Sequence, residues 1–396
     1  MKTERFFDML LSFGSDWRVD EVIEDTVGIK VDIYLLYCGK EPPYDYAPVR
    51  CWRHLDTMQY KSYIHARLPR FRTVDGKVTT LVPPWADKHE RQTYLFEAVV
   101  IDTLLATTNQ SKTASLMKCS FEVVNRIMHR ASERGQRRRH ASQALRHLSI
   151  DEKSFKKGHQ YVTVLSDPVG GQVLDVAEGR TKDSCEKLID NALTVWQRSQ
   201  VESISMDMWK AFLRAAQQKL PQAKIIHDKF HLIAYLNKAI DKVRRKEVKR
   251  HPELKNSRYA LLKNTENLTQ KQRAKFDAIR QANYQVSKAW QVRENFKDAF
   301  GNDTAAQGRA IFEEWFFTAL QCGIKEVVEV AIMFSDHING IINAMTSTLN
   351  NAMAERLNGK IQLLKATARG YRSFQHFRNA ILFFYGKLNL YPLNSR

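Results

Sequence analysis

The sequence predicts an α/β protein. Its central domain is expected to be a mixed five-stranded sheet with helices, interrupted by an all-α insertion and preceded by a helix-turn-helix region and a small N-terminal domain. Three observations favour this fold class. Strand-like and helical segments alternate over residues 148–226, helical patterns fill residues 240–343, and residues 110–131 have helix-turn-helix spacing.

The central segments come in the order three strands, helix, strand, helix, strand. Expected strands are 148–150, 161–165, 172–176, 201–206 and 223–226, with turn signals at Lys157-Gly158 and at 167–171. Apolar residues at helical spacing predict a helix over 181–198 (Cys185, Leu188, Ile189, Ala192, Leu193 and Trp196), and a second helix, 208–219, stops at Pro221. This order is the pattern of an RNase H-like domain, in which the first and fourth strands are neighbours.

Three acidic residues occupy special places in this pattern. Asp151 follows the first strand and Asp207 follows the fourth, so both are expected at one end of the sheet. Glu355 lies in the helical stretch 351–367, on a polar stripe with Asn351, Asn358 and Gln362; the apolar stripe is Met353, Leu357, Ile361 and Leu364. Neighbouring carboxylates repel unless cations neutralise them, and hard divalent cations prefer oxygen ligands. The three acids therefore predict a two-metal site for phosphoryl transfer, with Asp151, Asp207 and Glu355 as ligands.

Four segments together carry a resemblance to a known family: LSIDEKSFKKGHQYVTVLSD, GRTKDSCEKLID, the stretch from ISMDMWKAF to DKVRRKE, and NNAMAERLNGKIQLLKATARGYRSFQHFR. The chain resembles the DDE transposases of bacterial insertion sequences of the ISL-three family, well from about Pro84 onward and loosely before it. The resemblance implies an enzyme that binds the terminal inverted repeats of its element. It also implies metal-dependent DNA strand cleavage and strand transfer through the triad Asp151, Asp207 and Glu355, with two Mg²⁺ or Mn²⁺ ions per active site.

The implied partners are double-stranded DNA, as transposon ends and target, and a second copy of the chain in a homodimer or larger assembly on DNA. Two other function classes stay open. One is a catalytically inactive DNA-binding relic, and the other is a structure-selective nuclease on the same fold.

The charge of the chain agrees with a DNA partner. The formal net charge is +19 and the pI is about 9.6, so the surface attracts polyanions. Basic residues cluster at 130–140, at 238–251 and after the third acid, and we expect residues 134–140 to connect the DNA-reading and catalytic parts. Candidate backbone contacts are Arg137, Arg138, Arg139, Arg356, Lys360 and Lys365, with Arg369 and Arg372 in the same cluster.

The stretch 110–131 is a candidate sequence reader. Ala114 lies in the first helix, a tight turn follows near Lys118, Ser120 is placed as N-cap, and Val124 and Ile127 face inward. The residues left outward to meet a major groove are Glu122, Asn125, Arg126 and His129. The alternative is an ordinary αα-hairpin.

The first eighty residues resemble the family's zinc-binding module only in part. The segment Cys51-Trp-Arg-His-Leu-Asp56 is present, but Cys38 lacks its paired cysteine and Thr73 and Gly76 stand at later ligand positions. Because structural zinc needs four N or S ligands, we expect no structural zinc and a small domain held by Tyr, Trp and Leu side chains. A different cluster of Cys38, Cys51 and His54 is a weak alternative.

Residues beside the acids have more modest expected roles. Glu152 should point to the opposite face of its strand from Asp151, and Asp228 and His231 should support the triad without joining it. Trp209 is expected to pack under its helix, with stacking on DNA as the alternative. Trp290 and Arg293 are expected in the core of the insertion, with stacking on an unpaired base as the alternative.

The expected division of the chain is a degenerate zinc-finger-like domain (1–85), a helix-turn-helix region with basic linker (86–140), the core (141–239 and 344–396) and the insertion (240–343). In the insertion, Leu236, Ile240 and Val243 share one helix face, and Thr269 and Thr304 are placed as N-caps. Five scattered cysteines and the lack of a signal peptide or long apolar run suggest a cytoplasmic, nucleoid-associated bacterial protein.

Overall fold

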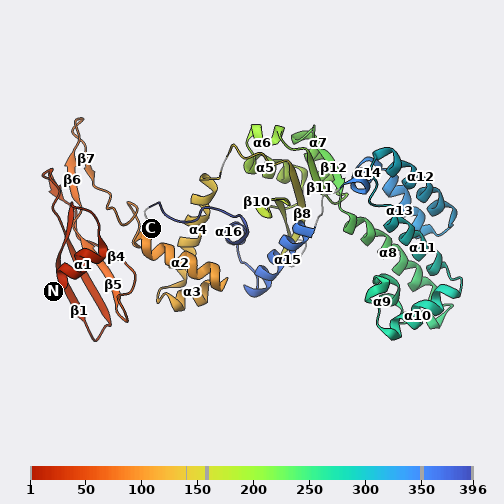
Figure 1. Ribbon diagram of the computed structural model, residues 1–396, viewed down its shortest axis with the longest axis horizontal. Helices are drawn as coiled ribbons and strands as arrows, with labels where there is room; N and C mark the ends of the chain where they lie inside the picture. The colour runs from red at the N-terminus through yellow and green to blue at the C-terminus, as the bar shows by residue number, and fades with distance from the viewer. Residues whose placement is uncertain (1, 140, 157–159, 348–351, 394–396) are drawn as a thin grey trace. The chain divides into compact units, whose positions relative to one another are not determined.

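The chain forms two compact units in a computed structural model that describes residues 2–139, 141–156, 160–347 and 352–393. One unit comprises residues 1–139 with 387–396, and the other comprises residues 140–386. The protein is of mixed α and β structure (Figure 1). None of the described helices is long and apolar enough to cross a membrane.

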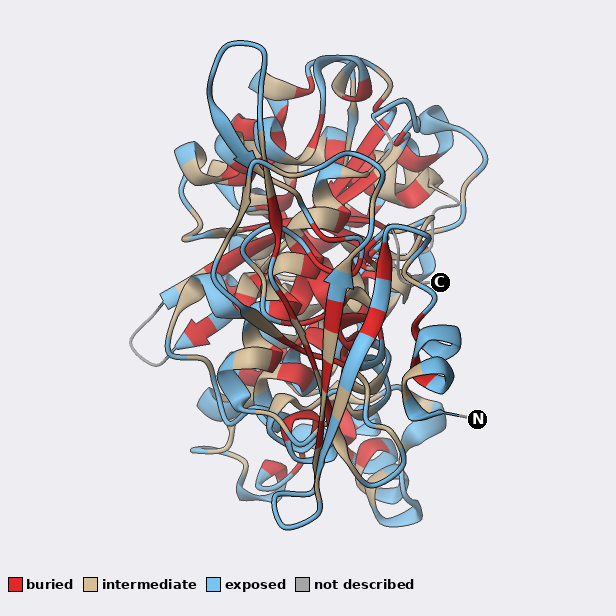
Figure 2. Ribbon diagram, turned by 90° about the vertical axis from the view of Figure 1, so that its left-hand side faces the viewer, coloured by how far each residue is buried: buried red, intermediate tan, exposed pale blue. Residues whose placement is uncertain are grey.

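The N-terminal unit begins with a helix, α1 (Thr3–Leu11), and a four-stranded sheet of order β1-β2-β5-β4. Its strands are β1 (Trp17–Asp25), β2 (Lys30–Tyr37), β4 (Arg50–Arg53) and β5 (Lys61–Ala66), and a smaller sheet holds β3 (Asp45–Tyr46), β6 (Pro69–Arg72) and β7 (Val78–Thr80). Buried and half-buried residues alternate along β2 from Lys30 to Leu35, as expected for a period-two strand, and Figure 2 shows how buried and exposed residues are distributed over the chain. The buried core includes Trp17, Trp52 and Trp85 with Leu11, Leu35 and Leu68, so Trp and Leu side chains hold this domain, as predicted.

Three helices complete this unit: α2 (Tyr94–Thr107), α3 (Gln110–Leu116) and α4 (Phe121–Arg137). The last residues of the chain pack here too, because the Arg134 and Arg138 guanidinium groups donate to the carbonyl oxygens of Leu390 and Tyr391, both at 2.6 Å. The sequence had placed residues 387–396 with the core. Residues 134–140, expected to form a connector, do not form a separate linker. Residues 134–137 are the end of α4, and His140 lies outside the described residues.

The second unit contains a five-stranded sheet of order β10-β9-β8-β11-β12. The strands are β8 (His147–Lys156), β9 (Gln160–Asp167), β10 (Gln172–Glu178), β11 (Ser203–Met206) and β12 (Lys224–His227). The first three pair antiparallel, β11 lies parallel to both β8 and β12, and so the first and fourth strands are neighbours, as predicted. Of the predicted turn between β8 and β9, Lys157 and Gly158 lie outside the described residues.

Helices cover both faces of this sheet. On one face, α5 (Lys182–Ala192) and α7 (Lys210–Lys219) share a core with Leu148, Ile150 and Leu165. On the other face, α16 (Phe374–Tyr385) stacks Phe377 on Phe155 of β8, and α15 (Ala352–Thr367) lies nearby along the sheet (Figure 1). Alternation along β8 therefore directs 148 and 150 to one face and 151, 153 and 155 to the other.

Three local predictions for this unit were wrong. Asp151 lies within β8, because the strand continues to Lys156. The helix expected over 181–198 is two helices, α5 and α6 (Val195–Ser199), because Thr194 starts a new helix with a capping box; Trp196 is consequently 47% exposed. Trp209 does not pack under α7 but is 42% exposed at its N-terminus, and its indole N–H donates to the carbonyl of Arg180 at 3.1 Å.

Residues 229–346 are all described and contain helices and no strand. The α-helices are α8 (Lys229–Glu247), α9 (Arg258–Leu262), α10 (Gln270–Gln281), α11 (Gln285–Asp298), α12 (Ala305–Gln321), α13 (Lys325–Ser335) and α14 (Ile338–Thr346), with 3₁₀ turns at Pro252–Leu254 and Thr265–Asn267. Thr269 and Thr304 are N-caps with capping boxes, and Leu236, Ile240 and Val243 are buried, all as predicted. The boundary expected at residue 240 falls inside α8, since this helix runs unbroken out of the sheet domain. Trp290 and Arg293 are 7% and 2% exposed, which confirms the core expectation for both and excludes stacking on a ligand.

Candidate active site

Asp151 and Asp207 lie side by side on neighbouring strands. The parallel register of β8 and β11 pairs Ser149 with Ser205, and each acid stands two residues further along its strand. The next strand continues this arrangement, since Met206 pairs with His227 and the backbone N–H of Asp228 donates to the Met206 carbonyl at 3.0 Å. Three carboxylates therefore follow one another across three adjacent strands.

Both carboxylate oxygens of Asp151 have partners. Its Oδ2 is 2.6 Å from Nδ2 of Asn358 and 2.7 Å from Nζ of Lys153, and its Oδ1 accepts from the backbone N–H of Glu152 at 2.7 Å. Asn358 comes from α15, so the polar stripe of this helix does face the acids, while Leu357, Ile361 and Leu364 are buried. Asn351, predicted on the same stripe, lies outside the described residues.

Asp207 pairs with a histidine. Its Oδ2 lies 3.3 Å from Nδ1 of His231, and its Oδ1 accepts from the backbone N–H of Met208 at 2.7 Å. Burial favours a higher pKa for Asp207, but the hydrogen bond and charge of His231 outweigh it and the pKa is lowered. The hydrogen bond to Asp207 raises the pKa of His231 against the effect of burial, and the charges of Asp207, Asp228 and Asp151 add to the rise.

Glu355 is the least satisfied of the acids. Its Oε1 is buried and has no hydrogen-bond partner among the described residues. Burial and the charge of Asp228 raise the pKa of Glu355, and His231 acts in the opposite direction. Glu355, Asp207, Asp228 and Asp151 thus all lie within electrostatic range of the same imidazole, that of His231.

The donor set consists of carboxylate oxygens, which hard divalent cations prefer. Within the described residues, no three His, Cys, Asp or Glu side chains are placed so that together they could hold one ion. Lys153 and His231 instead neutralise Asp151 and Asp207. The orphaned Oε1 of Glu355 is the atom that fits a missing cationic partner, because a buried carboxylate oxygen is costly when nothing compensates it.

A family model described as Transposase, that of the ISL3-type DDE transposases, matches residues 148–381, a range that contains all three acids. The chain belongs to the ISL3 family of transposases. It is 28% identical over 368 residues to the transposase for insertion sequence element IS1557 of Mycobacterium tuberculosis, covering 85% of this chain and 82% of that relative. It is also 28% identical over 301 residues to the transposase for insertion sequence element IS1001 of Bordetella parapertussis, covering 74% and 73% of the two chains. The resemblance seen in the sequence is confirmed.

The structure also gives the contacts of the residues predicted to lie beside the acids. Glu152 faces away from Asn358 and pairs with the Arg180 guanidinium at 3.1 Å. Asp228 accepts from the backbone N–H of Phe230 at 2.8 Å and so caps α8, which carries His231. The N-terminus of α8 is in this way fixed beside the acids.

The predicted sequence reader corresponds to α3 and α4. Ser120 caps α4 by accepting from the Val123 N–H, Lys118 adopts a left-handed turn with φ 48°, and Ala114, Val124 and Ile127 are buried, as predicted. Glu122 and Arg126 are exposed; Asn125 and His129 are half-buried, and His129 lies 3.5 Å from Glu133. Contact of these four residues with a major groove stays a prediction.

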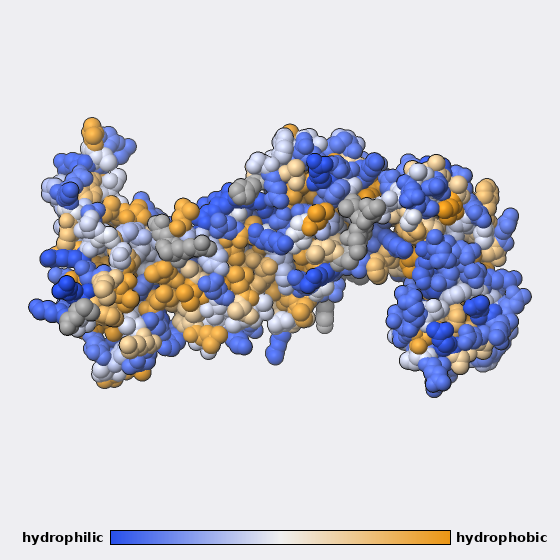
Figure 3. Space-filling model, in the orientation of Figure 1, coloured by the Kyte–Doolittle hydropathy of each residue, from blue (hydrophilic) through white to orange (hydrophobic). Residues whose placement is uncertain are grey.

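The residues predicted to contact DNA phosphates differ in whether other groups of the chain already bind their charged ends. Arg137 is exposed, with Glu133 at 3.7 Å, whereas Arg138 holds the C-terminal segment and Arg139 is half-buried. In the run 238–251, Arg244 and Arg245 form ion pairs with Asp241, and Lys246 forms one with Glu326, so part of the positive charge of this run is neutralised within the chain. The visible face of the insertion is mostly hydrophilic (Figure 3). Arg356 and Lys360 are exposed on α15, and Lys365 donates to the carbonyl of Ser154 at 2.6 Å.

Two residues that touch Asp151 were not among the predicted site residues. Lys153 could have been found, because it stands two residues after Asp151 on the same strand and hence on the same face. Asn358 was on the predicted polar stripe, one helical turn after Glu355, but its amide had no assigned role. Their contact with Asp151 depends on how α15 docks on β8, which the sequence does not specify.

Proposed function

We propose that this chain is a DNA transposase that binds the terminal inverted repeats of an insertion sequence and catalyses DNA strand cleavage and strand transfer. In this proposal Asp151, Asp207 and Glu355 form a DDE triad on an RNase H-like core. The strand order β10-β9-β8-β11-β12, with three antiparallel strands followed by two parallel ones, supports that assignment of the core.

The observation that supports the proposal is the neighbourhood of the three acids. Asp151 and Asp207 occupy matched positions on adjacent parallel strands, and α15 brings Glu355 to the same histidine with one buried oxygen left without a partner. A structural carboxylate cluster would be expected to have its buried oxygens satisfied. A site that takes a cation and a phosphate would leave such an oxygen open.

The two divalent ions, Mg²⁺ or Mn²⁺, would be held by Asp151, Asp207 and Glu355. When bound, they supply activation of the attacking oxygen and stabilisation of the leaving oxygen at phosphorus. The protein's own residues position the acids: Asn358 orients Asp151, the Met208 N–H and His231 orient Asp207, and Asp228 fixes the start of α8. We assign Asp228 and His231 this supporting role.

Other parts of the chain are suited to binding DNA. We propose that α3 and α4 form a helix-turn-helix that reads the repeat through Glu122, Asn125, Arg126 and His129. Arg137, Arg356 and Lys360 are the exposed candidates for backbone contacts. Since two transposon ends must be brought together, the proposal includes a homodimer or larger assembly on DNA.

The experiment is incubation of the purified chain with a labelled duplex that carries the element's own terminal repeat, with Mg²⁺ or Mn²⁺. We expect nicking at the repeat boundary followed by transfer of the new 3′ end to target DNA. The Asp207→Asn variant is the matched control, because it keeps the size of the side chain and removes its charge. It should bind the repeat and leave it uncut.

Other outcomes would replace the proposal. Binding of the repeat without cleavage under either metal would indicate a DNA-binding relic. Cutting of junctions or RNA hybrids without joining of ends would indicate a nuclease on the same fold.

A further inference from the structure

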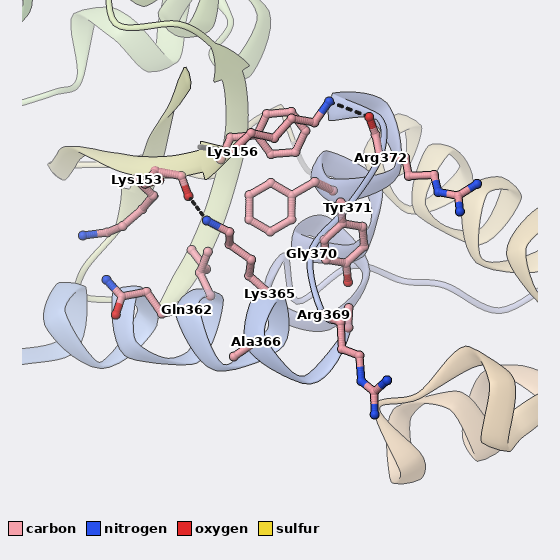
Figure 4. A pocket seen from close by; sticks show the side chains of 14 residues that line it. Lys153, Lys156, Gln362, Lys365, Ala366, Arg369, Gly370, Tyr371 and Arg372 are labelled. Carbon is pink, nitrogen blue, oxygen red and sulfur yellow. Dashed lines mark hydrogen bonds between the residues drawn. The ribbon is translucent and has the colours of Figure 1, made fainter. Parts of the chain in front are cut away.

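A cavity of about 1010 Å³ lies beside the acids, between the second half of β8 and the helices α15 and α16 (Figure 4). Its lining includes five cationic side chains, Lys153, Lys156, Lys365, Arg369 and Arg372, and no acidic one among the described residues. Tyr371 and Phe377 contribute aromatic surface at its wall. This lining selects an anionic ligand.

The cations of the cavity keep their charge available. Lys156 and Lys365 donate to neutral groups, the carbonyl oxygens of Arg372 and Ser154, both at 2.6 Å (Figure 4). The guanidinium groups of Arg369 and Arg372 make no hydrogen bond or ion pair with the described part of the chain, and in Figure 4 both extend away from the loop between α15 and α16 that carries them. A phosphodiester backbone presents the oxygens that such groups bind.

Lys153 is part of the cavity and also contacts the acidic site. It lines the cavity, and its Nζ is 2.7 Å from Oδ2 of Asp151, with the two side chains 15% and 17% exposed. An ammonium group at that oxygen competes with a divalent cation for Asp151, because Asn358 takes the other direction of Oδ2 and the Glu152 N–H takes one direction of Oδ1. Two cations cannot share one carboxylate oxygen without strong repulsion.

We propose that the cavity binds a backbone phosphate of the DNA and that Lys153 moves from Asp151 to this phosphate, so that DNA binding frees Asp151 for the metal ion. The proposal rests on the function proposed above. It makes Lys153 a positioning residue that links two events: without DNA its ammonium blocks metal loading, and with DNA it neutralises the phosphate. By linkage, metal and DNA then strengthen each other's binding.

The test measures Mn²⁺ binding to the full chain from the free-ion electron paramagnetic resonance signal, with and without the terminal-repeat duplex, after subtraction of Mn²⁺ bound by the duplex alone. For the wild type we expect DNA to tighten Mn²⁺ binding on the order of tenfold, within the usual range of such couplings. Lys153→Met, which keeps the apolar stem, should bind Mn²⁺ about that much more tightly without DNA and gain little when DNA is added.

Two further variants separate the effect of Lys153 from that of cavity charge and of folding. Lys156→Met removes a cavity cation that does not touch Asp151, and should leave the coupling in place. Lys153→Arg retains a group that can bind either carboxylate or phosphate, and should restore it. If Lys153→Met shows the wild-type Mn²⁺ affinity without DNA and the wild-type gain with DNA, the proposal for Lys153 is wrong.

That result would leave the proposed function intact provided that Asp207→Asn abolishes Mn²⁺ binding. If Asp207→Asn instead binds Mn²⁺ as the wild type does, the ion does not sit at the acids, and both proposals are overturned together.

Discussion

Glu97 in the N-terminal unit and Glu355 in the core are both helical glutamates with buried oxygens, and the protein treats them in opposite ways. Glu97 is 2% exposed, and its two oxygens pair with Arg130 and, at 2.6 Å, with Arg134. Glu355 has a buried Oε1 with no partner among the described residues. The first carboxylate is paired at both oxygens within the fold, whereas the second keeps a buried oxygen unpaired within the described residues.

The difference also applies to the cations around them. Arginines near the end of α4 form ion pairs with Glu97 and Glu90 and donate hydrogen bonds to backbone carbonyls of the C-terminal segment. The cations beside Glu355 and Asp151 border an open cavity and donate mostly to neutral carbonyls. A basic run in the sequence therefore does not by itself tell how much charge remains for DNA; the buried acids around it decide.

The largest expected effect is on catalysis. Asp151→Asn, Asp207→Asn and Glu355→Gln should each lower repeat cleavage by more than about a thousandfold, since each removes charge that the metals and the transition state require. Terminal-repeat binding, measured by gel shift in Ca²⁺, should stay within about a few-fold of the wild type. A variant that still cleaves normally would remove its residue from the triad.

The second prediction compares how removing the charge of each glutamate changes the free energy of unfolding. Glu97→Gln leaves the largely buried guanidinium of Arg134 without a carboxylate partner and Arg130 with Glu90 alone, and should lower the free energy of unfolding by about 3 kcal/mol. Glu355→Gln removes an uncompensated buried charge, and should lower it by less than about 1 kcal/mol or raise it. Urea unfolding of both variants measures these changes. An equal loss of unfolding free energy in the two variants would show that the fold does not distinguish the two glutamates.

The sequence could predict much of the site because its residues follow local rules. The sequence patterns placed Asp207 just after its strand and Glu355 on its helix, and Ser120, Thr269 and Thr304 were recognisable as caps; Asp151 was expected at the end of a strand that in fact continues to Lys156. The contacts of Lys153 and Asn358 with Asp151 could not be predicted, since they depend on the docking of α15 across about two hundred residues of chain. The position of residues 387–396 was missed for the same reason: arginines in α4 bind backbone carbonyls there, which no side-chain pattern reveals.

A third prediction concerns pH and the two histidines that are buried among the described residues, one in each unit. Burial lowers the pKa of His227 to about 4, with a further contribution from the charge of His337, and burial likewise lowers the pKa of His54 to about 4. A base whose pKa is depressed by folding stays neutral in the folded chain, so its stabilising effect is complete above the unfolded pKa near 6.5 and is lost as the pH falls toward 4.

Between pH 8 and pH 5 each of these histidines should cost about 2 kcal/mol of stability. His227→Phe should remove the acid loss from the core and leave that of the N-terminal unit, as read by hydrogen exchange in β12 and β4. Because the raised pKa of Glu355 acts in the opposite sense, stabilising at low pH and losing its effect as the pH rises, Glu355→Gln should make the acid loss of the core steeper. An unchanged pH profile in His227→Phe would show that another group controls it.

The smallest expected effect concerns the C-terminal segment that covers the Glu97 site. The Tyr391 hydroxyl donates to Oδ1 of Asp102 in α2 at 2.6 Å, and Tyr391→Phe should lower the stability of the N-terminal unit by about 1 kcal/mol through loss of this one bond. Hydrogen exchange should become faster in α2 and α4, which surround Glu97, and stay unchanged in α15 and α16. If exchange rises in α16 instead, the last residues belong with the core, as the sequence pattern had indicated, and the neutralised glutamate of the N-terminal unit does not depend on them.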